Sequence, residues 1–375
     1  MPRKPPAFTL LSPGLGPKCI GNFFNQLMAG DTSVRRIVIE RPGGYDALKL
    51  VEEPDRAPSP GEIAIEVAAA GVNYADGIIR MGLYESARKL HGYPITPGFE
   101  IAGRVSAVGA GVDTFAPGDE VVGLTLFGGY ASRVVLASDR VFARPARLIA
   151  EAGAAIPTVF LTAWWMVHEQ LHPRAGDTWL VHSAAGGVGS ALAQLGRLAG
   201  CRVIGVVGSA HKIDAARAAG CDGVIDKSKG DLWLHARTLS PGGYQAIFDA
   251  NGVSTLGDSY RHLAPTGRLL IYGFASMLPH DGRLNWLKLA WDWLRTPRFN
   301  PLSMTRDNKS VLACNLSFLS AHAERLREGM HWLLERFADG RLAPPPVTCF
   351  PLAQAADAQR AIESGRTVGK LLLIP

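Results

Sequence analysis

The chain has 375 residues, of which 47% are hydrophobic and 42 are glycine, and this length favours two folded domains over a single core. The formal net charge of +6 is small and the basic residues are scattered, so we do not expect nucleic acid as a partner. No apolar run reaches the ~20 residues of a membrane-spanning helix, so we expect no transmembrane segment. The five cysteines form no C-x-x-C pair and no metal-ligand spacing, which is typical of a cytoplasmic protein without a disulfide framework.

The first half of the chain has the pattern of an all-β domain. Residues 1–33 contain several prolines but no long apolar segment, which predicts a disordered extension or a true translation start at Met28. The first convincing strand covers 36–40, and residues 62–67 alternate strictly between polar and apolar. Short strands separated by Gly/Pro turns indicate a small β-barrel.

The most informative motif in the second half of the chain is a glycine-rich turn. Residues 184–189 read Ala-Ala-Gly-Gly-Val-Gly and lie between an apolar strand pattern and a helical pattern over 190–199. Ala184 replaces the first glycine of G-x-G-x-x-G, while Gly186 and Gly189 match and enclose Gly187 and Val188. Such a turn lets backbone N–H groups at a helix N-terminus meet a pyrophosphate, and therefore indicates a dinucleotide.

The region that follows alternates strands with helices. A helix is expected over 210–219, and buried strands are expected in four segments, which predicts an α/β fold with a doubly wound parallel sheet. The strand segments are 203–207, 222–226, 246–250 and 268–272. A helix around 324–340 and a strand over 368–374 complete the pattern.

The order of motifs along the chain resembles the medium-chain dehydrogenase/reductase superfamily, in particular its zinc-independent quinone oxidoreductase branch and the vesicle amine transport protein 1 group. The resemblance implies a GroES-like β-barrel catalytic domain over 34–155 and 301–375, and a Rossmann NADP-binding domain over 156–300. The active site would lie in the cleft between them. The motifs that carry the resemblance are AGVNYAD at 70–76, GLY at 82–84, PGFE at 97–100 with Gly103, PGD at 117–119, LTA at 161–163, VHSAAGGVG at 181–189 and VGKLL at 368–372.

Two positions bear on a catalytic metal. Zinc alcohol dehydrogenases of this superfamily have a cysteine where this chain has Asn73 and a histidine where it has Phe99, and they carry a four-cysteine loop that has no counterpart here. A catalytic zinc ion needs about three N, S or O side-chain ligands. We therefore predict no metal.

The nucleotide can be inferred from charge. NAD enzymes place an acidic residue after the second strand, whereas residues 207–212 contain none, so Ser209 and Lys212 could instead bind a 2′-phosphate. The resemblance adds Lys227, where related quinone reductases have a tyrosine, and Arg366, the nearest match to a C-terminal arginine. These residues predict NADP(H), although the two lysines could also be solvated surface charges.

Catalysis without a metal requires hydrogen-bond donors for the oxygen that becomes negative after hydride transfer. Asn73 and Tyr74 are the candidates, although Asn73 could be a turn residue and Tyr74 a core aromatic. A tyrosine found further along in some quinone reductases is Ile78 here, and Asp76 is expected to cap or orient a helix. The resemblance places five further residues at the nicotinamide, namely Thr162, Gly273, Phe274, Asn315 and Leu316.

A segment at 284–294 contains three tryptophans, and Leu287, Trp291 and Leu294 share one helical face. Three interpretations remain open for it: a packed core helix, a wall of the substrate pocket or a dimer contact, and a helix at a membrane surface.

These observations predict an NADPH-dependent, zinc-independent reductase of quinones or α,β-unsaturated carbonyls that is cytoplasmic and homodimeric. The alternative is a weakly catalytic or non-catalytic nucleotide-binding protein of the same fold that contacts a membrane or another protein, because fold alone does not determine function.

Overall fold

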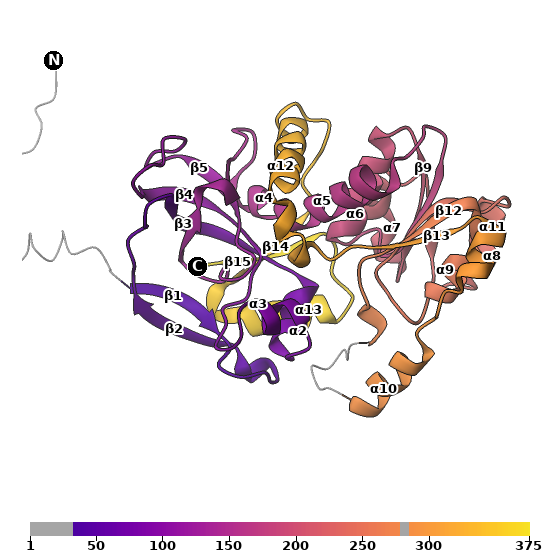
Figure 1. Ribbon diagram of the computed structural model, residues 1–375, viewed down its shortest axis with the longest axis horizontal. Helices are drawn as coiled ribbons and strands as arrows, with labels where there is room; N and C mark the ends of the chain where they lie inside the picture. Colours follow the sequence, from indigo (N-terminus) through magenta and orange to yellow (C-terminus); the bar gives the residue numbers. More distant parts are fainter. Residues whose placement is uncertain (1–32, 278–284) are drawn as a thin grey trace, which may run out of the picture.

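The computed structural model describes residues 33–277 and 285–375. They form two lobes side by side, each built around its own β-sheet (Figure 1). The extension predicted for residues 1–33 lies outside the described residues except for Ser33, which begins strand β1.

The first lobe is a seven-stranded, mainly antiparallel sheet centred on β3 (Glu62–Val72). This strand pairs with β4 (Glu100–Val108) and β6 (Arg133–Ala137), and with β15 (Lys370–Ile374) from the far end of the sequence. A separate antiparallel pair covers one side of the lobe. The remaining strands are β5 (Glu120–Leu124), β7 (Val141–Ala143) and β14 (Val347–Pro351) in the sheet, and β1 (Ser33–Val38) and β2 (Lys49–Pro54) in the pair.

The second lobe is a six-stranded parallel sheet in the order β10-β9-β8-β11-β12-β13, the doubly wound topology that was predicted. Its sixth strand, β13 (Ser310–Ala313), pairs with β12 and lies beyond the predicted domain limit at residue 300. Three of its four residues are partly buried and Ala313 is exposed, so it is less buried than the other strands. Those are β8 (Thr178–Val181), β9 (Arg202–Val207), β10 (Gly223–Asp226), β11 (Tyr244–Asp249) and β12 (Leu263–Ile271).

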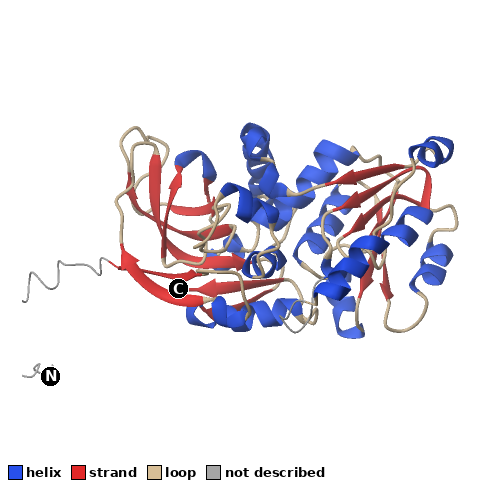
Figure 2. Cartoon of the chain, turned by 60° about the horizontal axis from the view of Figure 1, so that its bottom comes forward, coloured by secondary structure: helices blue, strands red, loops and turns tan. Residues whose placement is uncertain are grey.

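Three helices lie where the two lobes meet, as Figure 1 shows, and the lobes remain separate when the molecule is turned (Figure 2). They are α5 (Pro157–Trp164), α6 (Gly187–Leu198) and α12 (Ala323–Ala338). Phe160 of α5 packs edge-on against Phe337 of α12, with ring centroids 4.8 Å apart. Helix α5 also packs on α6 of the second lobe and on β5 of the first, so it sits against both lobes.

Helix α2 (Tyr74–Arg80) is held by a buried ion pair. The Arg80 guanidinium donates to Glu363 at 2.7 Å, and the side chains of this pair are 0% and 2% exposed. Arg80 also donates to Gln359, so α2 is fixed against α13 (Ala355–Glu363). The other helices are α3 (Glu85–Leu90), α4 (Ala150–Ala154), α7 (Ile213–Ala218), α8 (Leu232–Leu239), α9 (Leu256–Arg261), α10 (Trp286–Arg295) and α11 (Pro301–Asp307).

Candidate active site

A cavity of about 1200 Å³ lies between the two lobes. Its lining comes from the carboxyl ends of the parallel strands, from α5, and from α2 and β15 of the first lobe. Ligands of doubly wound sheets bind at this edge of the sheet, and a cavity of this size can take a dinucleotide together with a small substrate.

The glycine-rich turn brings the N-terminus of α6 to the cavity. A Cβ atom at Gly189 would lie 2.3 Å from the Ser183 carbonyl oxygen, and one at Gly187 would lie 2.7 Å from Val159 Cγ1. Neither position has room for a side chain, so α6 packs tightly on both the turn and α5. The N-cap of α6 is Gly186, which has no side chain that could accept a hydrogen bond from the N–H groups of the first turn. The first N–H groups of α6 are therefore available to a ligand, as a pyrophosphate requires.

Three polar side chains meet at the floor of the cavity. The Lys370 ammonium donates to Asn73 Oδ1 at 2.5 Å and lies 2.5 Å from Glu100 Oε1. Asn73 Nδ2 donates to the same Glu100 oxygen at 3.0 Å, and the N–H of Thr158 donates to the other oxygen at 2.6 Å. Because lysine can only donate and a carboxylate can only accept, both contacts set the same orientation of the Asn73 amide. One Nδ2–H group remains for a ligand.

Asp76 fixes the backbone at Asn73. Its carboxylate accepts from the N–H groups of Asn73 and Gly98 and from the Tyr130 hydroxyl, and it forms a capping box at the start of α2. Burial raises the pKa of Asp76 to about 6, although these hydrogen bonds oppose the shift. The expectation that Asp76 caps a helix is confirmed.

Comparison with known proteins identifies the family. Residues 59–146 match the family described as alcohol dehydrogenase GroES-like domain, and residues 219–373 match the family described as zinc-binding dehydrogenase. The synaptic vesicle membrane protein VAT-1 homolog of Rattus norvegicus is 32% identical over 344 residues, which cover 91% of this chain and 84% of the rat protein. The chain belongs to the medium-chain dehydrogenase/reductase superfamily.

Solved structures agree with this assignment. The Escherichia coli quinone oxidoreductase complexed with NADPH superposes with a TM-score of 0.79 and 29% identity, over 91% of this chain and 100% of that one. A quinone oxidoreductase of Pseudomonas syringae gives a TM-score of 0.77, also at 29% identity and with the same coverage. The predicted superfamily, the VAT-1 group and the fold of a GroES-like domain plus a Rossmann sheet are confirmed, and the chain is an oxidoreductase of this superfamily.

Most of the residues predicted from the sequence line the cavity of this oxidoreductase. Ala184, Ser209 and Arg366 do not: Ala184 is fully buried beneath the turn, and Arg366 is exposed beside the cavity. The lining includes Asn73, Tyr74, Thr162, Gly186, Gly187, Val188, Gly189, Lys212, Lys227, Gly273, Phe274, Asn315 and Leu316.

One end of the cavity, called the ribose end because the 2′-phosphate of NADP(H) is expected there, is rich in positive charge. Lys212 and Lys227 both line it, and the Lys212 ammonium donates to the Gly365 carbonyl at 2.5 Å. Burial lowers the pKa of Lys212, and the neighbouring charge of Lys227 lowers it further. An anion placed between the two lysines would relieve this repulsion.

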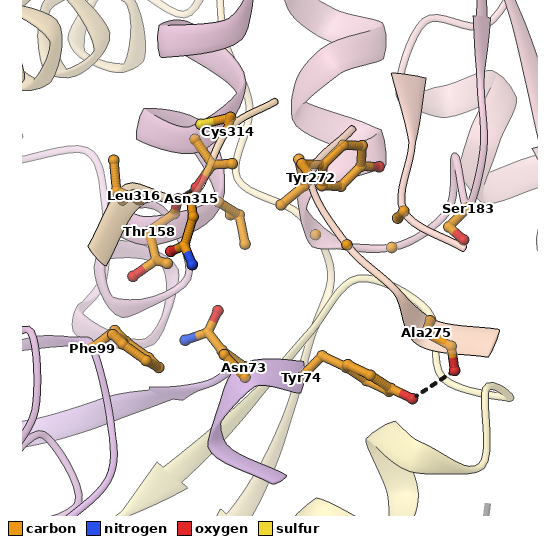
Figure 3. Close-up of a pocket in the computed structure, with 18 of the residues that line it drawn as sticks. Asn73, Tyr74, Phe99, Thr158, Ser183, Tyr272, Ala275, Cys314, Asn315 and Leu316 are labelled. Carbon is orange, nitrogen blue, oxygen red and sulfur yellow. Dashed lines mark hydrogen bonds between the residues drawn. The ribbon is translucent and has the colours of Figure 1, made fainter. Parts of the chain in front are cut away.

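The two predicted catalytic residues point in different directions. Figure 3 shows the Asn73 side chain directed into the cavity toward Asn315, and Tyr74 directed away toward Ala275. The Tyr74 hydroxyl donates to the Ala275 carbonyl at 3.2 Å. Burial raises the pKa of Tyr74 to about 12, so the hydroxyl stays protonated in this contact between the lobes.

The positions that hold zinc in related enzymes have other contacts here. The Phe99 ring lines the cavity and packs edge-on against Tyr84, with centroids 5.9 Å apart, while Asn73 is bound by Lys370 and Glu100. Within residues 33–277 and 285–375, no group of three His, Cys, Asp or Glu side chains is placed to hold a metal ion.

Three residues of the site were not predicted from the sequence. Glu100 and Lys370 stand inside motifs quoted above, but nothing in the sequence shows that strands so far apart pair through β3. Tyr84 also stands in a motif, and its hydroxyl lies in the cavity, 2.8 Å from Ser317 Oγ and 3.2 Å from Asn315 Oδ1. Burial raises the pKa of Tyr84.

The tryptophan-rich segment forms α10, and its apolar side chains are exposed. Leu287 is 85% exposed, Trp291 59% and Leu294 63%, so the packed-core interpretation is wrong. The helix carries a hydrophobic face as predicted, but the described chain presents no core against it. Leu289 on another side of α10 lines the cavity. Leu284 lies outside the described residues, and no helix among the described residues is long and apolar enough to cross a membrane.

Proposed function

We propose that this chain is an NADPH-dependent, zinc-independent reductase that transfers a hydride to a quinone or to the C=C bond of an α,β-unsaturated carbonyl. The observation that carries the proposal is the Asn73 amide, held by Lys370 and Glu100 beside the turn that would bind the pyrophosphate. The similarity to the Escherichia coli quinone oxidoreductase complexed with NADPH supports it.

The residues around the cavity fit NADPH. The N–H groups at the start of α6 would hold the pyrophosphate, and Ser209, Lys212 and Lys227 would meet the 2′-phosphate. Thr162, Gly273, Phe274, Asn315 and Leu316 would surround the nicotinamide. NADPH supplies the hydride when it is bound, and the protein supplies orientation and electrostatics.

Asn73 stabilises the substrate oxygen as it becomes negative. Its free Nδ2–H group faces the cavity, and the Lys370 ammonium on Oδ1 polarises the amide so that Nδ2 becomes a stronger donor. Because Lys370 and Glu100 are 3% and 0% exposed, water screens this effect weakly. For an enone, Tyr84, whose hydroxyl is protonated at neutral pH, or a water molecule delivers the proton to the α-carbon; for a quinone, the same donors protonate the oxygen that becomes the hydroxyl of the hydroquinone.

The donor set does not fit a catalytic zinc ion. Phe99 has no ligand atom, the Asn73 amide is a poor ligand that is already bound, and Glu100 is neutralised by Lys370. We therefore assign no step to a metal. Stoichiometric zinc in the purified protein would contradict this assignment.

The deciding experiment follows NADPH oxidation against a panel of quinones and enones. We expect turnover with members of the panel, and we expect Asn73→Ala to lower kcat while the Kd for NADPH stays unchanged. NADPH binding without turnover of any acceptor would contradict the reductase proposal and favour the alternative function.

That alternative, nucleotide binding with little turnover at a membrane or protein surface, is favoured by the exposed apolar face of α10. Within the main proposal we assign this face to a contact between two copies of a cytoplasmic homodimer. Sedimentation equilibrium is expected to give twice the chain mass for the wild type and a smaller average mass for Trp291→Asp. Monomers that co-sediment with lipid vesicles through Trp291 would contradict the homodimer and support the membrane surface.

A further inference from the structure

His211 lies beside the ribose end of the cavity, next to the lining residue Lys212 and outside the lining itself, and neither the motifs nor the comparisons give it a role. It belongs to the turn Ala210–Lys212 that follows β9, and its ring is exposed. The Nδ1 atom lies 3.1 Å from Ser209 Oγ, and the Nε2 atom lies 3.1 Å from the carbonyl oxygen of Arg366. The imidazole therefore connects the hydroxyl expected to meet a 2′-phosphate with the segment that leads to β15.

These two contacts determine how the ring is protonated. A carbonyl oxygen only accepts, so Nε2 must carry a hydrogen and donate to Arg366. In the neutral ring Nδ1 is then an acceptor, and the Ser209 hydroxyl must donate its proton to it. In this state the only proton of Ser209 is engaged by His211 and cannot be donated to a phosphate.

Protonation of the ring reverses the contact with Ser209. Both nitrogens of an imidazolium donate, so Nδ1–H donates to Ser209 Oγ and the serine proton becomes free to point at an anion. The ring also gains a positive charge at the edge of the same cluster. Ser209 and His211 thus become, together, a donor and a cation for a phosphate.

We propose that His211 is a proton-linked specificity residue, which takes up a proton when a 2′-phosphate binds and thereby favours NADP(H) over NAD(H). The proposal rests on the nucleotide choice made above. Because binding and protonation are linked, a phosphate that promotes protonation of His211 is itself bound more tightly when the ring is protonated.

The charged residues near the ring belong to several elements. Lys212 lies on the same turn, Lys227 follows β10, and Arg366, whose backbone carbonyl accepts from the ring, lies on the segment after α13. Of the two nearby carboxylates, Asp226 is engaged by the N–H and hydroxyl of Ser228, and Asp214 on α7 is directed to solvent. A phosphate carrying ≈ −1.5 to −2 charge beside the ring would favour the imidazolium, which donates from both nitrogens.

The test is isothermal titration calorimetry of the full chain with 2′,5′-ADP and with ADP, at pH 7.5, in two buffers that differ in ionisation enthalpy. We expect proton uptake when 2′,5′-ADP binds and none when ADP binds. His211→Asn should abolish the uptake and weaken 2′,5′-ADP by about tenfold, roughly the effect of one charge-assisted hydrogen bond. His235→Asn, which alters an exposed histidine on α8, should match the wild type.

The outcomes separate this proposal from the function on which it rests. If 2′,5′-ADP binds no better than ADP, the choice of NADP(H) fails. If 2′,5′-ADP binds better but proton uptake is the same in the wild type, His211→Asn and His235→Asn, the nucleotide choice stands and the role of His211 is overturned. The affinity of the wild type for 2′,5′-ADP, relative to His211→Asn, should also rise as pH falls from 8.5 to 6.5; a constant ratio would contradict the proposal.

Discussion

Replacement of Lys370 by methionine tests the buried cluster most directly. The lysine and Glu100 are 3% and 0% exposed, so Lys370→Met leaves a carboxylate in the interior without its cation. The Glu100 side chain also packs directly on Gly71, because a Cβ atom added at Gly71 would come within 2.4 Å of the Glu100 carboxylate. The carboxylate therefore has little room to move toward water. Breaking a buried pair in this way costs about 3–5 kcal/mol. Urea unfolding should therefore show a loss of that size.

The chain offers a matched control for this substitution. Lys89 and Glu85 on α3 also lie 2.5 Å apart, but their side chains are 66% and 63% exposed. Lys89→Met should cost less than about 1 kcal/mol because water screens the pair. The double variant Glu100→Gln/Lys370→Met should recover most of the stability lost by Lys370→Met, because it removes the uncompensated charge. Equal losses in Lys370→Met and Lys89→Met, or no recovery in the double variant, would refute the reasoning.

Three further predictions concern the nucleotide, the turn and pH. Lys212→Ala should weaken the binding of NADPH by roughly tenfold or more in fluorescence titrations and leave the binding of NADH almost unchanged, because a charged partner of the 2′-phosphate is lost. The control Lys229→Ala should change neither affinity, and equal losses for both nucleotides in Lys212→Ala would contradict the assignment. Gly187→Ala should destabilise the protein by about 1–3 kcal/mol in urea unfolding, because the added methyl group would overlap α5, whereas Gly242→Ala, with open space around it, should cost little. The pKa of Asp76 is about 6 in the folded chain against 3.8 for the free group, so the folded chain binds this proton more tightly than the unfolded chain does. The difference stabilises the fold by roughly 2–3 kcal/mol below pH ~4, and this contribution is lost as pH rises through 6. Unfolding measured from pH 4 to 7 should show this slope in the wild type and not in Asp76→Asn, and parallel pH profiles would contradict it.

The fold was predictable because local patterns and motif order agreed. The strands of the parallel sheet were found from their β-branched apolar runs, and the turn at 184–189 was found from its glycines. The short strand β13 was not found: it has four residues with a single β-branched one, Val311, and none of the four is fully buried. The exposed face of α10 was one outcome among the three interpretations left open, since an apolar stripe indicates that a face is covered without saying by what.

The site was predictable where it depends on neighbouring residues and not where it depends on pairing across the chain. Asn73 and the turn stand in contiguous motifs. Lys370 and Glu100 also stand in motifs, but their function arises only when β15 and β4 both pair with β3. Tyr74 shows the converse, because its position in a motif did not show that its hydroxyl is engaged by Ala275.

The place of Lys370 in the sequence also bears on how the protein is made. Asn73 and Lys370 are 297 residues apart, and the whole parallel sheet, from β8 to β13, is encoded between them. During synthesis the second lobe can therefore complete its sheet while residues 70–72 of β3 still lack their neighbour β15. Residues 70–72 of β3, beyond the part of that edge that pairs with β6, have no partner until β15 is synthesised, when β15 pairs with them and brings the charge that orients Asn73.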